Sequence, residues 1–148
     1  MKSASFMDSA FAEAESASQR GEVPIGAVAV LAGQIVARAG NRTRELDDPT
    51  AHAEILVIRE ACSKLSSERL PQVDLYVTLE PCPMCAAAIS FARIRRLYFG
   101  ATDEKGGAVT SGVTYFSQPT CHHSPDIYPG IGEVQSVRLL RQFFQQKR

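Results

Sequence analysis

The stretch Thr78-Leu79-Glu80-Pro81-Cys82-Pro83-Met84-Cys85 constrains the fold most, because it joins a predicted strand to a predicted helix. The apolar run before it, residues 74–79, is typical of a buried β-strand. The alanine-rich segment after it strongly favours a helix. If that helix begins at about Cys82, the Cys82 and Cys85 sulfur atoms lie at positions i and i+3 on one face of its first turn. The positive helix end favours thiolates, and two thiolates so placed suit a Zn²⁺ ion.

Helix and strand alternate through the rest of the chain. Helical periodicity, with Thr50 as the expected N-cap of the second helix, is found in residues 6–20, 51–65, 82–93 and from 134 to the C-terminus. Strand patterns are found in residues 25–31, 34–39, 74–79, 95–100 and, weakly, 126–127. The first two strands form a predicted hairpin, and a long loop spans residues 103–125. This order predicts an α/β sandwich with helices on both faces of the sheet.

Composition limits the class of protein. A chain of 148 residues, with 45% hydrophobic and 22% charged residues, suits one globular domain, residues 1–148. The net charge of zero leaves any nucleic-acid contact to local patches. No apolar run is long enough for a membrane span, and no apolar signal segment follows the N-terminus. With only four cysteines in such a chain, we expect reduced thiols and a cytoplasmic protein.

A third metal ligand is needed, and His52 is the best candidate. It lies in the predicted first turn of its helix, as Cys82 does in its own. Three protein ligands leave one coordination position open, which is typical of catalytic zinc. Zinc lowers the pKa of bound water from about 15.7 to about 7. Glu54, two residues after His52, can move the proton that this water gives up.

A structural zinc site is the alternative interpretation. Cys121 and His122 could join Cys82 and Cys85 in a closed set of ligands that stabilises a binding module. That arrangement does not explain the placing of His52 and Glu54 at the start of a predicted helix. His-x-Glu followed by Pro-Cys-x-x-Cys is instead the known signature of zinc deaminases that act on nucleobases.

With these motifs the sequence resembles the bacterial tRNA-specific adenosine deaminases of the cytidine-deaminase-like superfamily. The resemblance covers nearly the whole chain and is weakest over residues 109–131. The matching segments are residues 22–27, 41–42, 50–54, 76–85, 99–101 and 143–144. It implies a three-layer α/β/α fold with a mixed, about five-stranded sheet. It also implies a homodimer with one Zn²⁺ per subunit, which deaminates adenosine to inosine at the wobble position of a tRNA anticodon stem-loop.

The resemblance also implies individual roles. His52, Cys82 and Cys85 would bind zinc, and Glu54 would be the catalytic proton shuttle. Substrate contacts would come from Asn41, the peptide N–H of Ala53, Asp103, Lys147 and Arg148. Arginine clusters at residues 42–44 and 93–96 could also bind phosphates, although such side chains more often only face solvent. Two other functions stay open: a zinc deaminase of free guanine, cytosine or cytidine, and a non-catalytic zinc-stabilised RNA-binding module.

Overall fold

The computed structural model describes residues 2–146, with side chains from residue 6 onward. The helices are α1 (Lys2–Gln19), α2 (Ala53–Leu65), α3 (Pro83–Ala92) and α4 (Glu133–Gln146), with a short 3₁₀ turn, η1 (Tyr115–Ser117). The strands are β1 (Gly26–Leu31), β2 (Gln34–Gly40), β3 (Val73–Leu79), β4 (Arg96–Ala101) and β5 (Asp126–Tyr128). The predicted elements are therefore present in the predicted order. No helix within residues 2–146 is long and apolar enough to cross a membrane.

The five strands form one mixed sheet in the order β2-β1-β3-β4-β5. Strand β1 pairs antiparallel with β2 and β3, whereas β3, β4 and β5 run parallel to one another. Leu79 and Ala101 are partners at the carboxyl ends of β3 and β4. The segments that follow these two strands therefore leave the sheet side by side, which is where α/β sheets commonly bind ligands.

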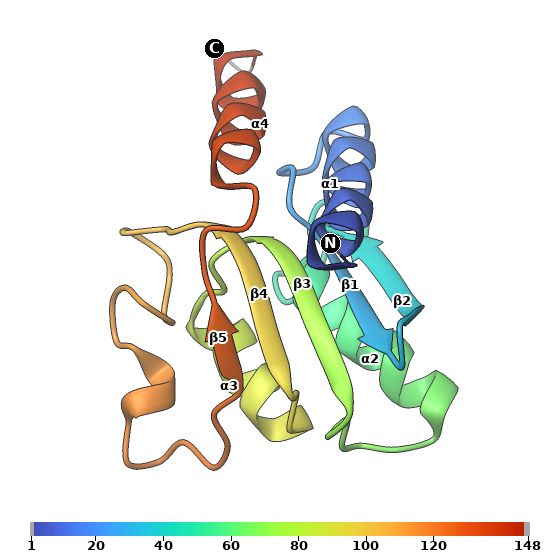
Figure 1. Cartoon of the computed structure of the whole chain (residues 1–148). Helices are drawn as coiled ribbons and strands as arrows, with labels where there is room; N and C mark the ends of the chain where they lie inside the picture. The colour runs from blue at the N-terminus through green and yellow to red at the C-terminus, as the bar shows by residue number, and fades with distance from the viewer. Residues whose placement is uncertain (1, 147–148) are drawn as a thin grey trace.

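Helices cover both faces of the sheet, as predicted (Figure 1). Helices α2 and α3 pack on one face, where Val57, Ile89 and Phe99 belong to the larger apolar core. Helix α1 packs on the other face, where Phe11 and Tyr76 belong to a smaller core that Leu139 of α4 also contacts. Burial of these apolar side chains on both faces stabilises the three layers.

Close contact between α1 and β1 depends on Gly26. A Cβ atom at this position would overlap the carbonyl oxygen of Ala10 and the backbone nitrogen of Ala14. Ala10 and Ala14 are fully buried and present only methyl groups to the sheet. Small residues on both elements therefore allow the two backbones to approach.

The predicted N-cap of α2 is wrong. Helix α2 begins at Ala53 with His52 as its N-cap residue. The Thr50 hydroxyl and N–H both donate to the Asp48 carboxylate, at 2.7 and 2.8 Å. Thr50 therefore closes a turn before the helix instead of capping it. Helix α3 likewise begins one residue later than expected, with Cys82 as its N-cap.

Candidate active site

The N-termini of α2 and α3 meet at the carboxyl end of β3. Their N-cap residues, His52 and Cys82, have extended backbones, and neither side chain caps its own helix. Both side chains are therefore free to meet between the helices. His52 Nδ1 lies 3.6 Å from Cys82 Sγ and 3.5 Å from Cys85 Sγ. The structure thus brings together the three residues that the sequence predicts as metal ligands.

These three donors fit a zinc ion. Their ligand atoms all lie within 4.8 Å of one another. Tetrahedral zinc with Zn–S near 2.3 Å and Zn–N near 2.0–2.1 Å places sulfur and nitrogen about 3.6 Å apart. The two N···S separations match this value, so the position of His52 relative to each cysteine suits a shared ion.

The closed four-ligand alternative does not form. Among the described residues, the metal-binding group comprises His52, Cys82 and Cys85 and includes neither Cys121 nor His122. The Cys121 sulfur instead contacts the Ser90 hydroxyl and the carbonyl of His123, at 3.5 and 3.1 Å. Cys121 therefore belongs to the packing of the 118–125 loop on α3.

The environment of the cysteines favours one thiolate. A hydrogen bond from the Cys85 thiol, supported by His52, lowers the pKa of Cys82 to about 4. The same hydrogen bond, together with burial, raises the pKa of Cys85. The hydrogen bond with the Cys82 sulfur also raises the pKa of His52. A cation bound by these atoms would favour loss of the remaining protons, because metal ligands are deprotonated.

Glu54 faces this cluster from the first turn of α2. Only 4% of the residue is exposed. Burial raises the pKa of Glu54 to about 7, and the neighbouring Cys82 charge acts in the same direction. The neighbouring Cys85 thiol acts in the opposite direction and lowers the pKa of Glu54. A buried carboxyl group that titrates near neutral pH is suited to general acid and base catalysis.

A small cavity of about 130 Å³ opens beside the cluster. Its lining consists of Ile25, His52, Glu54, Leu79, Glu80, Cys82, Asp103 and Gly106. Two of the candidate ligands, His52 and Cys82, therefore line one cavity together with the Glu54 carboxyl group and the predicted substrate contact Asp103. Glu80 was not predicted for the site, although a glutamate at the end of an apolar strand, beside the Pro-Cys motif, was visible in the sequence.

Asn41 lies beside the start of α2 and is 6% exposed. Its Oδ1 accepts the N–H of Ala53 at 2.8 Å. This bond supplies the capping contact that the His52 side chain does not make, and it orients the Asn41 amide NH₂ group as the remaining donor. The Ala53 N–H is engaged by the same bond, so its predicted contact with a base would require that bond to be exchanged.

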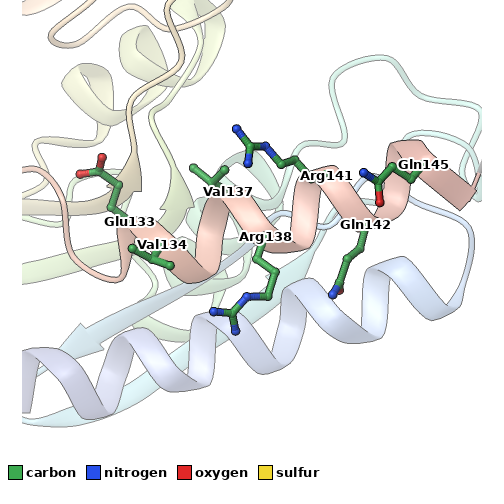
Figure 2. Close-up of a pocket in the computed structure, with 7 residues that line it drawn as sticks. All are labelled: Glu133, Val134, Val137, Arg138, Arg141, Gln142 and Gln145. Carbon is green, nitrogen blue, oxygen red and sulfur yellow. The ribbon is translucent and has the colours of Figure 1, made fainter.

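A larger groove of about 550 Å³ continues from the cavity to α4. Ile25, Leu79 and Asp103 line both hollows. The side contributed by α4 consists of Val137, Leu140, Arg141 and Phe144. Another hollow, of about 460 Å³, is lined by α4 residues. Figure 2 shows that Arg138 points toward α1 and that Arg141 points away from it. This second hollow contains none of the candidate metal ligands.

Most arginines in the predicted phosphate-binding clusters have protein partners. Arg95 forms a two-point ion pair with Asp74, with both N···O distances at 3.0 Å, and Arg96 lies 3.7 Å from the same carboxylate. Arg42 pairs with Glu45 at 2.8 Å. These contacts favour a structural role for the two clusters. Lys147 and Arg148 lie outside the described residues.

The chain is similar to known proteins in sequence and in fold. The sequence matches the MafB19-like deaminase family over residues 1–148. A tRNA-specific adenosine deaminase of Agrobacterium fabrum is 70% identical over 143 residues, which cover 97% of this chain and 94% of that protein. A solved structure from a study of A-to-I editing by tRNA deaminases at the wobble position is 69% identical, with a TM-score of 0.91 over 92% of this chain and 99% of the other.

A more distant structure shares the fold alone. The guanine deaminase of Nitrosomonas europaea is 20% identical and has a TM-score of 0.82 over 95% of this chain and 83% of the other. Similarity at this level shows the α/β/α architecture and does not assign a substrate. The much higher identity to the tRNA enzymes decides the family. The chain therefore belongs to the MafB19-like deaminases and to the family of tRNA-specific adenosine deaminases.

Proposed function

We propose that this protein is a zinc-dependent enzyme that hydrolytically deaminates adenosine to inosine at the wobble position of a tRNA anticodon. The observation that carries the proposal is the meeting of His52, Cys82 and Cys85 around one point, with the Glu54 carboxyl group beside them. High identity to tRNA-specific adenosine deaminases supports the substrate. We further propose that residues 1–148 act as one deaminase domain.

His52, Cys82 and Cys85 would hold one zinc ion per subunit. Zinc in such a site acts as a Lewis acid that makes water a nucleophile near neutral pH. Glu54 takes a proton from this water and delivers it to N1 of adenine while the water oxygen adds to C6. Glu54 then carries a second proton, from the hydroxyl group now on C6, to the amino group. The C6–N bond breaks, ammonia leaves and the C6 carbonyl of inosine forms. The burial of Glu54 keeps its carboxyl group able both to accept and to donate a proton.

The groove beside α4 is suited to the nucleotides that flank the target base. It offers the Phe144 ring, 51% exposed, and the guanidinium of Arg141 next to the cavity. Single-stranded bases commonly stack on such groups. Asn41 would donate its amide to the flipped nucleotide, and Asp103 would lie beside it. Lys147 and Arg148 would add phosphate contacts, and the protein would act as a homodimer in the cytoplasm.

The test is deamination by purified, zinc-loaded protein. An arginine tRNA stem-loop with adenosine at the wobble position, free adenosine, guanine, cytosine and cytidine are assayed separately for ammonia and deaminated product. Inosine formed only in the stem-loop supports the proposal. Turnover of a free base or nucleoside with the stem-loop unchanged would replace it with a metabolic deaminase.

A second comparison separates an enzyme from a binding module. Glu54→Ala should keep zinc and RNA binding while losing turnover, because Glu54 moves protons and does not ligate the metal. A wild-type protein that binds zinc and RNA but releases no ammonia would support the non-catalytic RNA-binding module instead.

A further inference from the structure

Glu80 is a buried carboxylate that serves one loop. It follows β3 directly and is 3% exposed. Its Oε2 atom accepts the N–H groups of Val109, Thr110 and Ser111, each at 2.9 Å. Its Oε1 atom accepts the Asp103 N–H at 2.8 Å and the Ser111 hydroxyl at 3.0 Å. All five of these hydrogen bonds come from residues 103–111, so a single side chain holds both ends of this loop.

The loop has no regular structure of its own and forms part of the cavity wall. Residues 103–111 contain turns and bends but no helix or strand. Asp103 in turn organises the tip, because its Oδ1 atom accepts the N–H groups of Lys105 and Gly106 at 3.2 and 3.0 Å. Asp103 and Gly106 both line the cavity beside the metal cluster. The contacts therefore run from Glu80 through Asp103 to the wall of the site.

Gly107 allows the loop to lie against the carboxylate. A Cβ atom at Gly107 would lie 2.5 Å from the Glu80 carboxyl carbon and 2.6 Å from the Asp103 carbonyl oxygen. The Gly107 N–H also donates to that carbonyl at 2.8 Å. The Glu80 carboxylate is thus enclosed by loop backbone, and small movements of the loop would break its hydrogen bonds.

We propose that Glu80 is a positioning residue for the deaminase reaction, and that it holds Asp103 and Gly106 as the cavity wall against which the target nucleoside is aligned. This inference rests on the proposed function. Glu80 acts through the loop backbone and is neither a metal ligand nor a proton carrier. Its removal should impair the chemical step more than RNA affinity, because the groove along α4 supplies other RNA contacts.

The Glu80→Gln substitution should break one hydrogen bond of this arrangement, the one from the Asp103 N–H. A glutamine has one acceptor oxygen, and three N–H donors hold that oxygen at the Oε2 position. Its NH₂ group then faces the Asp103 N–H, so two donors oppose each other. The Ser111 hydroxyl can rotate and accept instead. The substitution should therefore release Asp103 while the other end of the loop stays anchored.

The experiment compares zinc-loaded Glu80→Gln with wild type by three measurements: amide hydrogen exchange, zinc content and single-turnover deamination of the wobble-adenosine stem-loop. The peptide that contains Asp103 should exchange at least ~10-fold faster. Zinc content should stay at the wild-type value. Misalignment of about 1 Å can cost on the order of 100-fold in rate, so we expect a fall of at least ~10-fold in the single-turnover rate. The Kd for the stem-loop should change less than about 3-fold, because the contacts along α4 remain.

Two further variants separate positioning from general stability. Asp74→Asn breaks another carboxylate contact, the ion pair with Arg95 at the opposite end of β3, and should lower the melting temperature without changing the single-turnover rate. Ser111→Ala removes only the hydroxyl donor. Its hydrogen exchange at Asp103 and its single-turnover rate should lie between those of wild type and Glu80→Gln. It also provides the test if Glu80→Gln does not fold.

Three results would overturn the proposal: unchanged exchange at Asp103, an unchanged turnover rate despite faster exchange, or an equal loss of rate in Asp74→Asn. If the wild-type protein does not deaminate the stem-loop, the proposed function fails. Hydrogen exchange would then still decide whether Glu80 anchors the loop.

Discussion

Replacing Asn41 by alanine should destabilise the start of α2, because it removes the acceptor for the buried Ala53 N–H. The His52 side chain makes no capping hydrogen bond, so it does not replace that acceptor. Leaving a buried donor unsatisfied costs about 1–3 kcal/mol of unfolding free energy. For a chain of this length, each kcal/mol of lost unfolding free energy lowers the melting temperature by roughly 2–4 °C. We therefore expect the melting temperature of Asn41→Ala to fall by roughly 2 to 12 °C.

Asn41→Asp is the matched control. It keeps an oxygen acceptor for the Ala53 N–H and places a negative charge near the positive end of α2, which is favourable. Its melting temperature should therefore stay close to that of wild type. It has no NH₂ donor for the substrate, and its charge opposes RNA phosphates, so the deaminase rate should fall in this variant as well.

The assay is thermal unfolding of zinc-saturated protein together with stem-loop deamination for all three proteins. The melting temperature should be lower for Asn41→Ala than for Asn41→Asp, whereas the deamination rate should be low in both variants. Equal melting temperatures for wild type and Asn41→Ala would refute the capping role. Full activity in Asn41→Asp would refute the role of the amide as a substrate donor.

Three other substitutions test the site. Glu54→Gln should lower the deamination rate by on the order of 10²–10⁴-fold and leave the zinc content unchanged. Single-turnover kinetics and metal analysis measure these two quantities. A rate within a few-fold of wild type would exclude Glu54 as the proton carrier. Cys85→Ser should lose zinc and the rise in melting temperature that zinc gives, and full zinc occupancy would remove Cys85 from the ligand set. Gly107→Ala should lower the free energy of unfolding by about 1–3 kcal/mol, because the added methyl group would overlap the Glu80 carboxylate. Denaturant titration measures this change, and an unchanged free energy of unfolding would show that the loop can move aside.

The sequence alone was sufficient for the parts of this protein that depend on neighbouring residues. Two residue pairs each lie at the start of a helix whose apolar pattern is clear in the sequence: His52 with Glu54, and Cys82 with Cys85. Helical geometry then places both members of each pair near the same helix end. The alternation of helix and strand predicted the three layers in the same way. The helix boundary at Thr50 was missed, because the competing turn with Asp48 is equally local.

Only the tertiary structure decided the contacts between distant segments. The Glu80 carboxylate meets backbone N–H groups 23 to 31 residues away in the chain, and Arg95 meets Asp74 across 21 residues. Backbone N–H groups carry no residue-specific signal, so no motif in the sequence marks them as partners of Glu80. Likewise, a cluster of arginines looks the same in sequence whether its charges bind RNA or a neighbouring carboxylate. The fold distinguishes these cases, because strand register and helix packing determine which groups share a buried volume.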